Sequence, residues 1–194
     1  DWYSFYRRRM LTAKAAVGLT VAEMDRVELG VHTINRSTHE PLELMVNADG
    51  VEKIDYLTAI YDIDPVGSTP LRRGLNDVGQ YFESGNTDDT GVLQTTEGLP
   101  AGDTSVFWDA TVDDDADDID DSGGECQRAY VIAMTDGYYN GSFTIANRDG
   151  NSAFALTDGT ANTLADIADE YYHTDLDTTL ANLVPEKGFD DSET

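Results

Sequence analysis

Two short segments of the chain carry oxygen-bearing side chains of the kind that hold a hard cation. In Gly67-Ser68-Thr69-Pro70-Leu71, a hydroxyl stands where a glycine turn leads into a helix. In Met134-Thr135-Asp136-Gly137, a carboxylate follows directly on an apolar run. Mg²⁺ and Ca²⁺ prefer oxygen ligands from Asp, Ser, Thr and water. Thr69 and Asp136 are therefore candidate metal ligands, provided that the fold brings both segments to one edge of a sheet.

The same two segments also have simpler interpretations. A Ser or Thr before Pro70 is typical of a helix N-cap, because its side chain accepts from an unpaired backbone N–H. An Asp-Gly pair such as Asp136-Gly137 is typical of a turn. Spacing alone leaves both the metal site and these local roles open.

Apolar residues at helical spacing predict four helices around these segments. The apolar sets are Met10, Ala13, Val17, Val21 and Met24; Val51, Ile54, Leu57, Thr58 and Tyr61; Leu71, Leu75, Val78 and Phe82; and Leu164, Ile167, Ala168, Tyr171 and Tyr172.

Three further segments have the composition of strands. Alternation over residues 27–34 and a short apolar run at 42–46 predict a hairpin. The continuous apolar run at 129–134 is typical of a strand buried on both faces of a parallel sheet. Helices alternating with strands indicate an α/β domain, in which ligands bind at the carboxyl ends of the strands.

Length and charge limit the possible functions. The 194 residues suit one domain, and 40% hydrophobic residues are enough for a core. With 38 acidic and 12 basic residues the net charge is −26, which repels nucleic acid and anionic membranes. A salt-rich habitat is one explanation for this charge. We find no apolar run long enough for a spanning helix and no signal-peptide pattern, and the chain reads as an excerpt of a longer protein.

Other candidate sites are weaker. The polar stretch 84–125 reads as a long acidic surface insertion, within which residues 118–123 match the start of a calcium-binding EF-hand loop. Ala129 stands where such a loop needs its bidentate Glu, so we favour a solvated loop. The single Cys126 excludes an intrachain disulfide. No Ser-His-Asp pattern appears, His32 reads as a structural residue, and we expect no enzyme.

The metal-site segments resemble the second and third elements of the metal-ion-dependent adhesion site of von Willebrand factor A domains. More narrowly, the chain resembles the PilY family of type IV pilus tip and biogenesis proteins along nearly its whole length. The blocks that carry this resemblance, in the family's order, are 2–10, 31–35, 67–73, 78–82, 126–128, 134–141, 162–168, 171–172 and 182–185.

This resemblance implies a partial von Willebrand A-like domain over residues 1–194: a Rossmann-like, mostly parallel sheet flanked by helices. The family's Asp-x-Ser-x-Ser loop is not in the sequence, so the first strand, and also the last, are expected to be missing. Thr69 and Asp136 carry over as ligands of Mg²⁺ or Ca²⁺. The implied function is an extracellular, pilus-associated adhesion module on the cell surface, whose protein partner is a pilus subunit or a host or surface ligand.

Two other functions stay open. A metal-dependent hydrolase is possible because Asp-rich sites activate water, with His173 as the one candidate base. A structural spacer with a vestigial metal site is the other. Tyr138, Tyr139 and Asn140, which follow Asp136, read either as the rim of a protein-contact surface or as a turn built on Asn140-Gly141.

Overall fold

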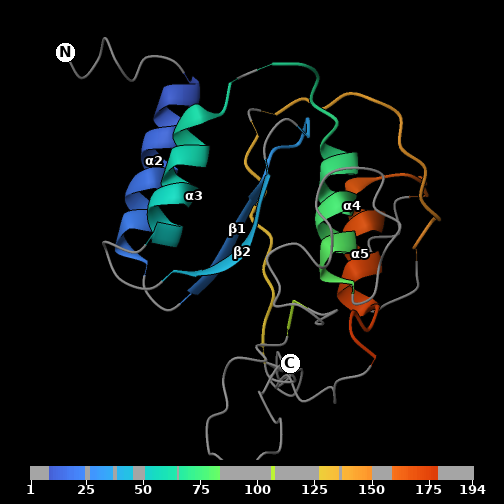
Figure 1. Cartoon of the computed structure of the whole chain (residues 1–194). Coiled ribbons are helices and arrows are strands. Elements are labelled where there is room, and N and C mark those ends of the chain that lie inside the picture. Colours follow the sequence, from blue (N-terminus) through green and yellow to red (C-terminus); the bar gives the residue numbers. More distant parts are fainter. Residues whose placement is uncertain are drawn as a thin grey trace, which may run out of the picture.

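Helices and one hairpin make up the regular structure of the chain. The computed structural model describes residues 9–24, 27–36, 39–45, 51–64, 66–83, 106–107, 127–135, 137–149 and 159–178. In Figure 1, the first two helices lie beside the hairpin and the last two form a separate pair. The elements are α2 (Arg9–Glu23), β1 (Val27–His32), β2 (His39–Met45), α3 (Val51–Asp62), α4 (Leu71–Phe82) and α5 (Leu164–His173).

The expected hairpin is present as the antiparallel pair β1 and β2. Its register shifts between Leu29 and Val31, where Gly30 lies close to the opposite strand. A Cβ at Gly30 would stand 3.1 Å from the Glu40 carbonyl oxygen, so a side chain does not fit comfortably there. Pro41 on the opposite strand has no N–H to offer the ladder, which suits this irregular position.

Two lysines join α2 to α3, each at the carboxyl end of the other helix. Lys14 of α2 donates to the Tyr61 carbonyl at 2.6 Å. Lys53 of α3 is buried and donates to the carbonyls of Ala22, at 3.3 Å, and Met24. The last carbonyls of a helix lack intrahelical partners and carry partial negative charge, which these ammonium groups satisfy.

The first part of the core lies between these helices and the hairpin. Tyr56 donates to the Gly30 carbonyl at 3.2 Å, and burial raises the pKa of Tyr56 to about 12, so it stays a donor. Ile54, one of the apolar residues whose spacing predicts this helix, is 53% exposed. The helix turns Lys53 inward to reach α2, which shifts the buried face by one residue. The cluster contains Val21, Tyr56 and Ile60, with Val17, Leu29, Val31 and Leu57 packed around it.

A second part of the core surrounds α4 and α5. Ile167 of α5 is completely buried, whereas Tyr172, another of the apolar residues whose spacing predicts this helix, is 75% exposed. Val106 and Phe107, from within the expected insertion at 84–125, pack here, and Phe107 stacks on Phe82 at 5.8 Å. The other residues of that insertion lie outside the described ranges. This cluster contains Tyr81, Phe82 and Val106, with Leu42, Val78, Phe107 and Leu176 around it.

The run at 129–134 differs from its expected state. Within the described ranges the one sheet is the two-stranded hairpin, and this run belongs to no strand. Tyr130 is 75% exposed, Ile132 84% and Met134 55%. No described strand pairs with the run. The mostly parallel, Rossmann-like sheet therefore stays a prediction.

None of the helices in the described part of the chain combines the length and the apolar character needed to cross a membrane.

Candidate functional site

The structure brings the loop after Asp136 against the start of α4. The Asn140 N–H donates to the Thr69 carbonyl at 2.8 Å, and the Thr69 N–H donates to the Asn140 side-chain oxygen at 3.0 Å. Asp136 itself lies outside the described residues. These reciprocal bonds join two segments that are about seventy positions apart, as convergence of the two candidate elements requires.

The start of α4 does not use Thr69 as its cap. Pro70 occupies the N-cap position, and no side chain makes a capping hydrogen bond there. The backbone supplies the first contacts instead, since Leu71 donates to the Thr69 carbonyl at 2.9 Å and Gly74 to the Pro70 carbonyl at 3.0 Å. Helix capping therefore does not explain why a hydroxyl stands at position 69.

Glycines shape the backbone on both sides of this contact. Gly67 has φ of 80° and Gly141 has φ of 88°, which is the left-handed region that side chains disfavour. Beside Gly67, the Asn35 side chain donates to the Val66 carbonyl and ties the turn to the end of the hairpin. The expected glycine turn before α4 is thus present.

Arg72 holds three segments together next to Thr69. Its guanidinium donates to the carbonyls of Gly141 and Asn162, both at 2.6 Å. The same group lies 5.3 Å from the ring centroid of Tyr139, within cation–π range. Tyr138 beside it is 97% exposed. The segment that follows Asp136 is therefore fixed at its backbone and presents aromatic side chains to solvent.

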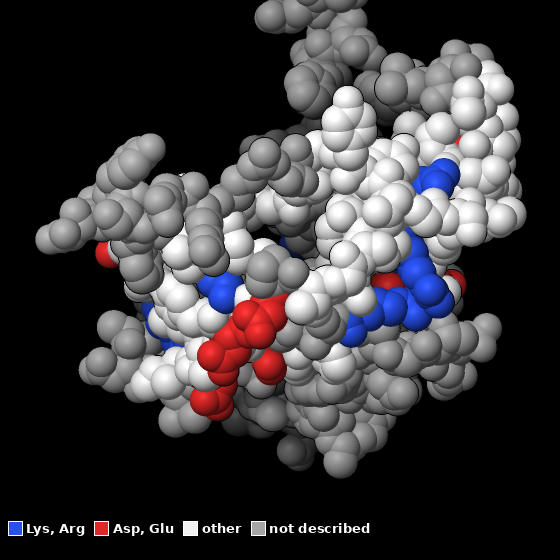
Figure 2. All heavy atoms as spheres, turned by 90° about the horizontal axis from the view of Figure 1, so that it is seen from above, with Lys and Arg blue, Asp and Glu red and all other residues white. Residues whose placement is uncertain are grey.

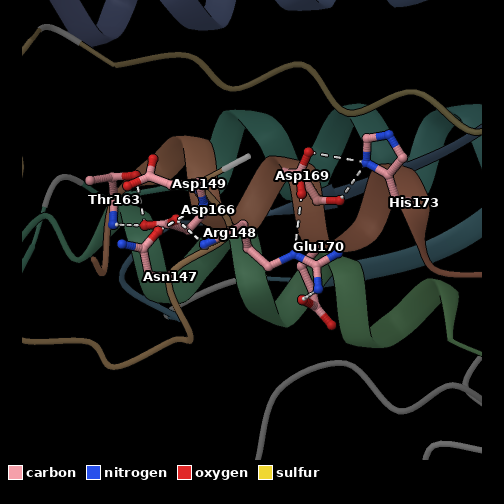
Figure 3. A network of polar contacts seen from close by, with 8 residues as sticks. All are labelled: Asn147, Arg148, Asp149, Thr163, Asp166, Asp169, Glu170 and His173. Atoms are coloured by element: carbon pink, nitrogen blue, oxygen red, sulfur yellow. Dashed lines mark hydrogen bonds and ion pairs between the residues drawn. The ribbon is translucent and has the colours of Figure 1, made fainter. Parts of the chain in front are cut away.

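A polar network anchors the far end of this loop on α5 (Figure 3). Asp166 is buried and accepts from the backbone N–H groups of Arg148 and Thr163, both at 2.8 Å. Thr163 and Asp166 form a capping box at the start of α5. The N–H of Arg148, and then that of Thr163, lower the pKa of Asp166, which keeps the carboxylate ionised.

Ion pairs extend this network along α5. Arg148 contacts Asp169 at 3.1 Å and Glu170 at 3.0 Å. Asp169 also lies 3.1 Å from the Nδ1 atom of His173, one turn further along the helix (Figure 3). His173, the one candidate base for a hydrolase, thus contacts Asp169 of its own helix.

A second buried cluster joins β1 to α4, and only the types of its residues could have indicated it in the sequence. Arg36 holds Asp77 with two hydrogen bonds, from Nε at 2.6 Å and from Nη2. The Nε2 atom of His32 lies 3.5 Å from Asp77, and both side chains are almost fully buried. Burial raises the pKa of Asp77, but the contacts with His32 and Arg36 outweigh it and leave the pKa below its usual value.

The described residues contain no group of three or more His, Cys, Asp or Glu side chains able to hold a metal. Asp136, the acidic segment 118–123 and Cys126 lie outside those ranges. The structure does place the Thr69 hydroxyl, which does not cap α4, beside the loop that Asn140 holds in place. Metal binding by Thr69 and Asp136 therefore stays a prediction.

Charges on this end of the molecule are unevenly spread. Figure 2 views it from above and shows Lys and Arg side chains in several places, the largest group to the right of the view, and a strip of Asp and Glu side chains near its middle.

The curated relatives that match the chain are type IV pilus biogenesis factors. The PilY1 protein of Pseudomonas aeruginosa strain UCBPP-PA14 is 27% identical over 219 residues, which cover 99% of this chain and 16% of the relative. PilY1 of strain PAK is 25% identical over 197 residues, or 90% of this chain and 15% of the relative. The expected resemblance to the PilY family is confirmed. No family model and no solved structure matches the chain.

Proposed function

We propose that the chain is a non-enzymatic binding module of a type IV pilus biogenesis protein, and that it engages a protein partner through a divalent cation. The similarity to PilY1 over almost the whole chain supports the pilus role. The fragment of the relatives that it matches is 16% or less of their length, so the proposal concerns this module alone.

The contact between Thr69 and Asn140 carries the proposal for the site. It holds the loop that follows Asp136 against the backbone of Thr69, the residue that carries the candidate hydroxyl ligand. Mg²⁺ or Ca²⁺ would be held by Thr69 and Asp136 together with water, and an acidic group of the partner would complete its shell. Tyr138 and Tyr139 stand beside this position as contact residues, since exposed aromatic side chains and arginines dominate protein interfaces.

Calorimetric titration of Mg²⁺ and Ca²⁺ into the longest polypeptide that the gene encodes tests the site. We expect Asp136→Ala to weaken cation binding by about tenfold or more, since a carboxylate is the strongest ligand in the set. Thr69→Ala should weaken it less. Asp64→Ala, which removes an exposed carboxylate three residues before Gly67, is the matched control and should leave the isotherm unchanged.

Isotherms of Asp136→Ala indistinguishable from wild type would reject Asp136 as a ligand. A partner assay completes the test: binding of purified pilus subunits should disappear with a chelator and return with Mg²⁺ or Ca²⁺. Partner binding that ignores the chelator would reject the cation as the bridge.

A further inference from the structure

Asn140 and Gly141 form the only Asn-Gly pair in the sequence, and the proposed function uses no more than the contact of this pair with Thr69. The side chain of an asparagine can be attacked by the backbone nitrogen of the next residue. Glycine hinders that attack least, because it has no Cβ. Both residues of the pair are exposed, so water reaches them. The pair is therefore a candidate for spontaneous deamidation, provided that its reacting groups are available.

The carbonyl group of the Asn140 side chain is activated by a hydrogen bond. The Thr69 N–H donates to the Oδ1 atom of Asn140 at 3.0 Å. A donor at this oxygen stabilises the negative charge that develops there when a nucleophile attacks Cγ, as the donors of an oxyanion hole do. The reciprocal bond from the Asn140 N–H to the Thr69 carbonyl, at 2.8 Å, keeps the asparagine beside this donor.

Two other asparagines accept the same kind of hydrogen bond and so allow a comparison. The Oδ1 atom of Asn147 accepts from the Asp149 N–H at 2.8 Å. The Oδ1 atom of Asn162 accepts from the Ile145 N–H at 2.7 Å. Their side-chain carbonyls are polarised as that of Asn140 is. The availability of the backbone nitrogen that follows each asparagine then decides which of them reacts.

The nitrogens that follow these asparagines differ in their hydrogen bonds (Figure 3). The residue after Asn147 is Arg148, whose N–H donates to the Asp166 carboxylate at 2.8 Å. The residue after Asn162 is Thr163, whose N–H donates to the same carboxylate at 2.8 Å. Among the described residues, the glycine N–H of the Asn-Gly pair donates no hydrogen bond. The other two nitrogens are held on the carboxylate until that bond breaks, whereas the glycine nitrogen has no such bond to lose.

We propose that Asn140 deamidates without an enzyme and that the aspartate it produces strengthens the cation site. The Gly141 nitrogen gives up its proton to water and forms a bond to Asn140 Cγ. The bond from Cγ to Nδ2 then breaks, and the side-chain nitrogen leaves as ammonia. Water opens the cyclic imide, which gives aspartate when it enters at Cγ and isoaspartate when it enters at the backbone carbonyl. No oxidant or reductant is needed.

Deamidation adds a negative charge directly against the backbone of Thr69. Aspartate has the shape of asparagine, so one carboxylate oxygen keeps the bond from the Thr69 N–H and the other replaces the amide nitrogen. Mg²⁺ and Ca²⁺ are bound well by carboxylate oxygens, which an amide nitrogen does not resemble. The effect on the cation rests on the proposed function, whereas the deamidation itself does not.

Peptide mass spectrometry of the full gene product, aged at neutral pH, tests the modification. We expect the peptide that contains Asn140 to gain the mass that separates an acid from an amide. Over the same time, the peptides that contain Asn147 and Asn162 should stay unchanged. Arg148→Gly is the matched variant, because it places a glycine after Asn147 but keeps an N–H that Asp166 can bind. In this variant Asn140 should still react about tenfold faster than Asn147 or more, since a hydrogen bond to a charged group must break first.

Two results would overturn the deamidation. An Asn140 peptide that stays unchanged in the wild type rejects it outright. Equal rates at Asn140 and Asn147 in the Arg148→Gly variant reject the hydrogen bond as the reason for selectivity.

Cation titration of Asn140→Asp against freshly purified wild type, both as the full gene product, tests the effect on the site. Asn140→Asp should bind Mg²⁺ or Ca²⁺ about threefold more tightly or better, because a nearby negative charge attracts the cation. Asn147→Asp adds the same charge at an exposed asparagine at the far end of the loop, and should leave the affinity unchanged.

The results distinguish failure of the modification from failure of the cation site. Equal affinities of Asn140→Asp and wild type overturn the effect of deamidation on the cation and leave the site itself standing. Absence of cation binding in both proteins overturns the proposed function, while mass spectrometry still decides whether Asn140 deamidates.

Discussion

Asp77 is a buried carboxylate whose charge is held by two partners from the end of the hairpin. Arg36 contacts both of its oxygens, and His32 lies 3.5 Å away with both ring nitrogens buried and without hydrogen-bond partners in the structure. A 3.5 Å separation is an ion-pair distance rather than a good hydrogen bond. Arg36 is therefore the main partner, and the cluster fastens α4 to the hairpin.

Asp77→Asn should destabilise the protein by about 3 kcal/mol near neutral pH, because it removes the buried carboxylate charge that accepts two hydrogen bonds from Arg36. The pKa of Asp77 is lower in the folded than in the unfolded state, so its contribution is full above the unfolded value of about 3.9. It is lost as the pH falls through the folded value. Urea unfolding across the pH range measures both effects.

The control for this prediction is Asp55→Asn, which neutralises an exposed carboxylate on α3. It should change stability by less than about 0.5 kcal/mol. The difference in stability between wild type and Asp77→Asn should shrink as the pH drops below about 4. A difference that is constant with pH contradicts the ionised role of Asp77.

Close packing at the level of the helices depends on small residues. At Gly79 on α4 a Cβ would stand 2.3 Å from the ring of Tyr171 on α5, and the same ring donates through its hydroxyl to Asn76 at 3.0 Å. Gly18 on α2 has a similar nominal clash, 2.3 Å from the Tyr61 hydroxyl, but Tyr61 is 52% exposed and free to turn outward. The two glycines therefore form a matched pair.

Gly79→Ala should destabilise the protein by about 1–3 kcal/mol, because overpacking against the fixed Tyr171 ring exceeds the gain in helix propensity. Gly18→Ala should be neutral or stabilising by up to about 1 kcal/mol, since only the tip of Tyr61 must move. Thermal or urea unfolding of both variants measures this. A stabilised Gly79→Ala variant contradicts the observed contact between α4 and α5.

Helical periodicity predicted the four helices of the described residues and alternation predicted the hairpin, because those signals are local. Which face a helix buries depends on its neighbours, and there the sequence was less informative. The inward Lys53 is the example: its ammonium reaches the carbonyls that end α2, a contact that no pattern within α3 reveals. Burial of Asp77 likewise depends on Arg36, which is 41 positions away.

At the candidate site, too, local features could be predicted from the sequence and contacts between distant segments could not. Residue types and the glycine at position 67 predicted a turn leading into α4, and the structure contains it. The cap expected from Ser68 or Thr69 is absent. Pro70 takes the N-cap position, and the backbone N–H and carbonyl of Thr69 bond to Asn140. Convergence of the two segments was expected from the alternation of helices and strands and from the family resemblance, but the bonds between Thr69 and Asn140 themselves were not predicted. Metal binding by Thr69 and Asp136 stays a prediction.

For the whole molecule, repulsion among its charges is the dominant long-range force. A net charge of −26 on 194 residues destabilises the compact state, and salt screens it with a range of about 30 Å at 0.01 M and about 3 Å at 1 M. We therefore expect the melting temperature to rise steeply with KCl. A flat or falling dependence contradicts this account of the charge.

A charge-neutralised variant provides the control for the salt prediction. Asp55→Asn, Asp62→Asn and Asp64→Asn together remove three exposed carboxylates from α3 and the residues after it. The triple variant should melt higher than wild type at low salt and show a shallower salt dependence, because less repulsion remains to be screened. An unchanged slope would assign the salt effect to hydrophobic burial instead.

Terbium luminescence in the full gene product tests the central claim, a cation site at Asp136, most directly. Tb³⁺ takes the oxygen ligands that Ca²⁺ takes and emits when a nearby tyrosine is excited, and Tyr138 and Tyr139 follow Asp136 by two and three residues. We predict emission that Ca²⁺ displaces, that Asp136→Ala abolishes and that Asp64→Ala preserves. Undiminished emission from Asp136→Ala would contradict the site.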